Sequence, residues 1–186
     1  IYGYRRVTTV LEEPRSFVRR AAATYDVVTL ALAVPYHPIR SGAYSLVEDY
    51  VYTIEGFQDY LSRLKPGGLL VVPRWLQQPP SEDLRTLALA ITALRQRGGD
   101  PRQQVVAWRT YSTITLLVKE RPFTAEELAA IRRFAATRAF DLVYAPDLRA
   151  EEINRYNVLP EPIYEQTFAS MLRAEDPAAW YAAYPL

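Results

Sequence analysis

The chain lacks cysteine altogether, and it has one histidine and seven glycines among its 186 residues. Without cysteine it can form no disulfide, thiolate nucleophile, iron–sulfur cluster or zinc-ribbon site. The one histidine, His37, excludes paired-histidine metal motifs and leaves a single imidazole for any catalytic triad. Its place between Pro35 and Pro38 is typical of an ordinary loop residue, so no metal site is expected.

An excess of charge of one sign and long hydrophobic runs are also lacking. The formal net charge is +1, with arginines and carboxylates interspersed, which argues against nucleic acid as a partner. Apolar runs such as residues 27–34 are far shorter than the ~20 residues that cross a bilayer, and no signal peptide opens the chain. We therefore expect a soluble, cytoplasmic chain without membrane contact. Because it begins at Ile1 rather than Met, it is also expected to be part of a longer protein.

The first third of the chain predicts alternating strands and helices. Val7–Val10 is short and β-branched, and Pro14 opens a helix that runs through Arg20, at a helical position where its missing N–H is harmless. Residues 27–33 are apolar on both alternating faces, which favours a central parallel strand covered by helices. Residues 35–52 indicate an ordered loop, or a loop with a short helix, and Thr53 is placed as the N-cap of the next helix.

The remaining two thirds predict the rest of an α/β sheet. The helix after Thr53 is expected to stop at Pro66-Gly67-Gly68, before a buried strand over residues 69–72. A helix with Ser81 as its cap, a hairpin over residues 105–118 and a capping box at Thr124–Glu127 follow. The expected fold is a mostly parallel sheet with a C-terminal antiparallel hairpin and helices on both faces. Residues 1–146 form this domain, and residues 147–186 form a helical extension packed on it.

Ligands of open α/β sheets bind beyond the carboxyl ends of the strands. Three residues near those ends are therefore candidates for substrate binding: Tyr52, Arg74 and Trp75. Glu48 and Tyr44 are candidates for assisting proton transfer. The alternative is structural: the tyrosines pack the long loop onto the sheet, and Arg74 pairs with Glu48 or Asp49.

Several segments resemble a known family. They are Tyr25-Asp26-Val27-Val28, the loop at residues 41–46, the helix at residues 57–64 and Lys65-Pro66-Gly67-Gly68, with support from residues 122–124 and 140–146. Together they resemble the second half of the class I S-adenosylmethionine-dependent methyltransferase fold, in its spermidine-synthase-like branch. The similarity is strongest over roughly residues 7–120. This branch includes large bacterial proteins with an N-terminal membrane region, so the resemblance also allows a cytoplasmic domain of a membrane-tethered parent.

The resemblance implies a partial Rossmann-like sheet whose N-terminal, cofactor-binding strands are missing. S-adenosylmethionine would then bind the intact parent, and none would bind this chain alone. The residues matched to the cofactor side are Glu13, Ser16 and Ala31; for Glu13 the alternative is that it caps the helix that follows.

The chain departs from that family at two places. None of its glycines forms Gly-x-Gly, so the close backbone approach of a cofactor turn is absent. Residues 31–35 stand where aminopropyltransferases of this branch carry two carboxylates, and aliphatic side chains cannot deprotonate an amine. We therefore expect part of an S-adenosylmethionine-dependent (or decarboxylated-analogue-dependent) transferase for an unknown small acceptor, not a spermidine synthase. The alternative is a non-catalytic interaction or regulatory domain that retains the fold.

If the N-terminal strands are missing, the strand at residues 27–33 has a free hydrogen-bonding edge. An unpaired edge is a template for association. We expect this edge to pair with itself in a homodimer, or to be covered by residues 7–10 or by the C-terminal tail (residues 147–186).

Overall fold

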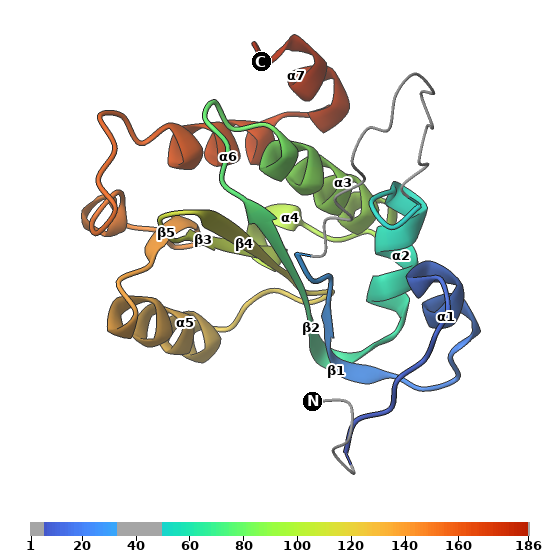
Figure 1. Cartoon of the computed structure of the whole chain (residues 1–186). Helices are drawn as coiled ribbons and strands as arrows, with labels where there is room; N and C mark the ends of the chain where they lie inside the picture. Colours follow the sequence, from blue (N-terminus) through green and yellow to red (C-terminus); the bar gives the residue numbers. More distant parts are fainter. Residues whose placement is uncertain (1–5, 33–49, 186) are drawn as a thin grey trace, which may run out of the picture.

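The structure is a computed structural model of the chain, and it describes residues 6–32 and 50–185. Five strands form one open, mixed sheet in the order β1-β2-β4-β3-β5, with helices packed against it (Figure 1). The α/β class expected from the sequence is therefore confirmed. The strands are β1 (Tyr25–Thr29), β2 (Leu64–Trp75), β3 (Val105–Arg109), β4 (Thr113–Val118) and β5 (Asp141–Tyr144).

The apolar runs suggested a mostly parallel sheet, and this prediction is wrong. Only β1 and β2 pair in parallel, and the pairs β2–β4, β3–β4 and β3–β5 within the described residues are antiparallel. The expected hairpin is confirmed, because a tight connection joins β3 to β4. Its second strand, β4, lies between β2 and β3, so those two strands share a direction without being neighbours. Hydrophobicity predicts that a strand is buried but does not say beside which strand it lies.

The strand expected at the centre of the sheet lies at its edge. β1 pairs only with β2 in the described sheet, and the side chain of Val27 is 53% exposed. Residues 7–10 do not form the predicted strand, and Val7 and Val10 are exposed. The tail does not cover this edge either, since its helices contact α3 and β5. Self-pairing of β1 stays a prediction.

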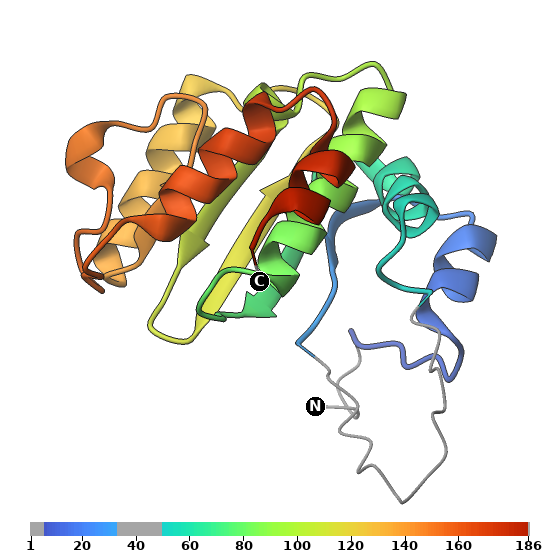
Figure 2. The same ribbon diagram turned by 90° about the horizontal axis from the view of Figure 1, so that it is seen from above.

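Helices cover both faces of the sheet, as expected. On one face α2 (Ile54–Ser62), α3 (Glu82–Gln96) and α6 (Ile163–Arg173) bury the main core, while α5 (Ala125–Thr137) packs on the other face (Figure 1). Short helices α1 (Pro14–Arg20), α4 (Pro101–Gln104) and α7 (Pro177–Ala183) and the 3-10 turn η1 (Ala150–Glu152) complete the chain. Figure 2 shows α7 lying beside α3, so the tail and the body are packed together.

Local signals in the sequence placed the helix starts correctly. The Thr53 hydroxyl accepts from the Gly56 N–H at 3.0 Å, and Thr124 and Glu127 form the predicted capping box. Ser81 is the N-cap of α3, but its side chain makes no capping bond to the helix. The end of α2 was placed too late, because the helix ends at Ser62 and residues 65–68 form an irregularity inside β2.

Candidate functional site

A cavity of about 280 Å³ lies at the carboxyl ends of β1 and β2, and we call it the strand-end cavity. Because parallel strands end at the same border of a sheet, the residues that follow them converge there. The segment that follows β1 contributes Ala31 and Leu32, and β2 contributes its final two residues. The lining consists of Ala31, Leu32, Tyr52, Arg74, Trp75, Gln77 and Glu82.

Arg74 is the best-fixed charged group of this cavity. Its guanidinium donates to Glu82 Oε2 at 2.8 Å and lies over the ring of Tyr52, 4.3 Å from the centroid. The Arg74 side chain is 20% exposed and that of Glu82 is 42% exposed. A guanidinium held between a ring and a carboxylate keeps one geometry, so the position of this charge at the cavity is fixed.

Four of the residues predicted from the sequence meet in this cavity: Ala31, Tyr52, Arg74 and Trp75. The catalytic candidates Tyr44 and Glu48, together with Asp49, lie outside the described residues. The carboxylate that pairs with Arg74 is Glu82, which was not among the expected partners. Trp75 is half exposed, so its indole is available to a ligand.

Glu13 and Ser16 do not line this cavity; they lie at the start of α1. The Glu13 carboxylate accepts from the backbone N–H of Arg15 at 3.0 Å and of Ser16 at 2.6 Å. Desolvation alone would raise the pKa of Glu13, but these bonds hold the pKa below its ordinary value. The contacts of Glu13 therefore show helix capping, which was the structural alternative. Its cofactor role stays a prediction.

Sequence reasoning missed Gln77 and Glu82 as cavity residues. Both follow β2, and Glu82 is the first residue of α3. A signal was present, because the segment that leaves the carboxyl end of a strand and starts a helix borders the ligand site in such sheets. Glu82 and Asp83 also lie in the first turn of α3, where a carboxylate complements the helix dipole.

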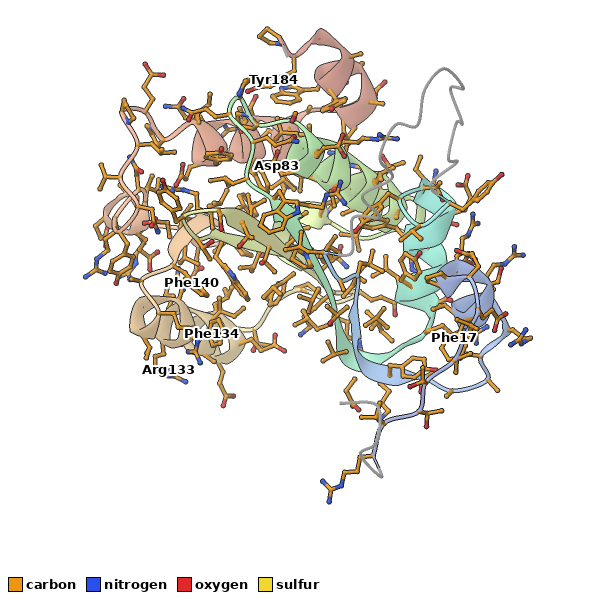
Figure 3. All side chains as sticks on the ribbon, in the orientation of Figure 1. Phe17, Asp83, Arg133, Phe134, Phe140 and Tyr184 are labelled. Atoms are coloured by element: carbon orange, nitrogen blue, oxygen red, sulfur yellow. The ribbon has the colours of Figure 1, made fainter. Side chains whose placement is uncertain are left out.

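Asp83 is a buried carboxyl group next to the cavity. Its side chain is 0% exposed, Oδ1 accepts from the Ser81 N–H at 2.8 Å, and Oδ2 has no hydrogen-bond partner within the described residues. Burial raises the pKa of Asp83 to about 6, although the Ser81 bond opposes the shift. Figure 3 shows Asp83 at the start of α3, below Tyr184.

This burial predicts an unusual pH dependence of stability. A carboxyl group whose folded pKa is about 6 and whose unfolded pKa is about 3.9 favours folding when protonated, and this contribution is lost as the pH rises from about 4 to 6. We expect Asp83→Asn, which stays neutral, to be more stable than the parent protein at pH 8, by on the order of 2–3 kcal/mol. Urea unfolding at pH 4.5 and pH 8 measures the difference.

Glu126→Gln is the matched control, because Glu126 holds the same helical position in α5 and is exposed. Its effect on the free energy of unfolding should be small and should not change sign with pH. A lower stability of Asp83→Asn than of the parent at pH 8 would contradict the burial argument.

Neither the models of known protein families nor the curated proteins give a match to this chain. Within residues 6–32 and 50–185, no three His, Cys, Asp or Glu side chains are grouped so that they could hold a metal ion. No helix in the same ranges is both long and apolar enough to span a membrane.

Proposed function

We propose that this chain supplies the acceptor-binding part of an S-adenosylmethionine-dependent (or decarboxylated-analogue-dependent) transferase with a Rossmann-like sheet. The acceptor is a small molecule that binds in the strand-end cavity, and the nucleoside cofactor is held by residues outside this chain. Spermidine synthesis is not its reaction.

One observation supports this proposal most. Residues far apart in the sequence, from Ala31 to Glu82, converge at the carboxyl ends of the one parallel strand pair in the described sheet. That is where open α/β sheets bind their ligands. The lining combines aromatic walls with a few fixed polar groups, which is typical of small-molecule sites.

The residues of this chain do not fit the cofactor itself. No Gly-x-Gly turn occurs in the sequence, so the close backbone approach to a nucleoside is lacking. The acid matched to the cofactor side, Glu13, already has both oxygens bonded to its own helix. This chain therefore contributes the acceptor site alone.

In this arrangement Glu82 is the described cavity residue best suited to accept a proton from an acceptor. Its Oε2 accepts a hydrogen bond from Arg74, and both side chains line the cavity. Trp75 offers an apolar surface on which an acceptor can lie. The aliphatic residues Ala31 and Leu32, which follow β1, supply no second acid.

That missing acid also favours a second candidate, a non-catalytic interaction or regulatory domain. The sequence upstream of Ile1 in a longer parent distinguishes the two. A strand followed by Gly-x-Gly and a ribose-binding acid would favour an enzyme, whereas a degraded turn would favour the interaction domain.

Trp75→Ala tests the acceptor site. We expect an increase of about tenfold in KM for the acceptor and an unchanged affinity for S-adenosylmethionine, because the indole lines only the acceptor cavity. The measurement uses the full-length protein, labelled S-adenosylmethionine and a panel of small amines, phenols and carboxylic acids.

Tyr111→Ala is the control, since Tyr111 is an aromatic residue that is 88% exposed and lies outside this cavity. It should leave KM unchanged. An equal effect of both substitutions, or none from Trp75→Ala, would place the acceptor elsewhere.

A further inference from the structure

A second hollow lies between α5, β5 and residues 149–156, on the sheet face covered by α5; we call it the α5 groove. Its volume is about 270 Å³. It shares no residue with the strand-end cavity. The lining consists of Arg132, Arg133, Ala135, Ala136, Phe140, Leu142, Arg149, Glu152, Arg155 and Tyr156.

Part of the groove is apolar and aromatic. Ala135 is 2% exposed and Leu142 is 5% exposed, so both are nearly buried apolar side chains of the lining. The ring of Phe140 stacks on Trp108, with centroids 6.4 Å apart and an interplanar angle of 23°. Figure 3 shows Phe140 near Phe134 of α5, and their centroids are 6.0 Å apart. A ring that is held by two other rings is a fixed surface on which a ligand ring can stack.

The wall opposite α5 is held by a buried carboxylate. Asp141 is 0% exposed, and its oxygens accept from the backbone N–H groups of Arg155, Tyr156 and Asn157 at 2.6, 2.7 and 2.8 Å. Three bonds from successive residues fix the backbone of this segment against β5. The positions of Arg155 and Tyr156 at the groove are therefore set by the fold.

Two of the four arginines in the groove are neutralised by carboxylates. Arg132 donates to Glu152 at 2.6 Å and to Asp147 at 2.9 Å, and Arg149 donates to Glu152 at 3.0 Å. Desolvation would raise the pKa of Glu152, but the two guanidinium groups lower it to about 2, so it stays charged. This network forms one end of the groove and leaves no charge there for a ligand.

The other two arginines, Arg133 and Arg155, have no carboxylate partner in the described part of the chain. Arg133 belongs to α5, and Arg155 belongs to the wall held by Asp141. The Arg155 guanidinium lies over the Tyr156 ring, 5.2 Å from the centroid. Two arginines of the groove lining, one from α5 and one from the segment held by Asp141, thus lack a carboxylate partner among the described residues.

We propose that the α5 groove binds a small anion built on a single aromatic ring, with a carboxylate or a phosphate as its charged group. The ring stacks on Phe140, and the anionic group takes hydrogen bonds from Arg133 and Arg155. Guanidinium groups bind both kinds of anion through paired N–H donors. The volume lies just below the usual range of small-molecule pockets, which restricts the ligand to about one ring.

The test is a titration of the isotope-labelled chain, followed by NMR, with phenyl phosphate, benzoate, phenol and inorganic phosphate. We expect saturable shifts of backbone signals over residues 133–142 and 155–156 with phenyl phosphate or benzoate, at a Kd of about 1 mM or tighter. The preferred probe of these two identifies the anionic group. Phenol and inorganic phosphate should bind at least about fivefold more weakly, because each lacks one half of the ligand.

Arg133→Gln and Arg155→Gln should each weaken binding at least about fivefold. Both side chains are exposed, so the folded state should survive, which the dispersion of the NMR spectrum verifies in the same experiment. Arg121→Gln is the matched control, because Arg121 is an exposed arginine outside the groove, and it should leave the Kd unchanged. Equal binding of inorganic phosphate and phenyl phosphate, an unchanged Kd in both groove variants, or no saturable shift would overturn the proposal.

Discussion

Asp141→Ala is expected to lower the free energy of unfolding by about 3–5 kcal/mol. The substitution removes the acceptor of three backbone N–H groups and the carboxylate that lies 3.5 Å from the buried guanidinium of Arg109. Arg109 is 1% exposed and would keep its charge with less compensation. Glu165, 3.8 Å from Arg109, is a poor substitute, because both of its oxygens are buried without a hydrogen bond in the described structure. Chemical denaturation at pH 7 measures the loss.

The pH dependence provides a second readout for Asp141. Desolvation opposes its ionisation, but the hydrogen bonds from residues 155–157 and the charge of Arg109 hold the pKa of Asp141 below its ordinary value. Its contribution is therefore present above the unfolded pKa of about 3.9 and is lost as the pH falls through the folded pKa. The difference between the parent protein and Asp141→Ala should shrink in acid.

Asp26→Ala is the control for Asp141, because Asp26 is also a strand carboxylate but its side chain is 81% exposed. Its pair with Lys65 lies in solvent, where screening leaves little net energy, so stability should hardly change. Similar losses for the two substitutions would show that the buried network does not hold the segment after β5.

Phe168→Ala is the second large expected effect, again about 3–5 kcal/mol. Phe168 is 0% exposed in α6 and belongs to the same hydrophobic cluster as residues of α2, α3 and β2. The substitution leaves a cavity between the tail and the body. Because both share one core, we expect a single cooperative transition at a lower denaturant concentration.

Phe134→Ala is the control for Phe168, since Phe134 is 40% exposed and loses only surface ring contacts, worth about 1 kcal/mol. A second, separate transition at residues 147–186 in the Phe168 variant would contradict the shared core.

What could be predicted from the sequence was local. Helix starts depend on a cap and its next three residues, so Thr53 and Thr124 identified α2 and α5 correctly. The hairpin of β3 and β4 was also found, because its two strands are close in sequence. The order of the strands depends on contacts between distant segments, and so the placement of β1 at the centre was wrong.

The candidate site also divides into residues that local position predicts and residues that depend on contacts between distant segments. Tyr52, Arg74 and Trp75 follow or face strand ends and were found by position alone. Glu82 was missed because its role depends on the turn that brings α3 back beside β2. The Asp141 network was missed because its donors are backbone groups of residues 155–157, which no side-chain pattern reveals.

The proposal that this chain binds the acceptor while residues outside it hold S-adenosylmethionine is tested most directly by calorimetric titration with S-adenosylmethionine. If residues 1–186 are part of a longer protein, we expect saturable heat for that protein and none for residues 1–186 alone. Tight binding by residues 1–186, or no binding by the full-length protein, would contradict it.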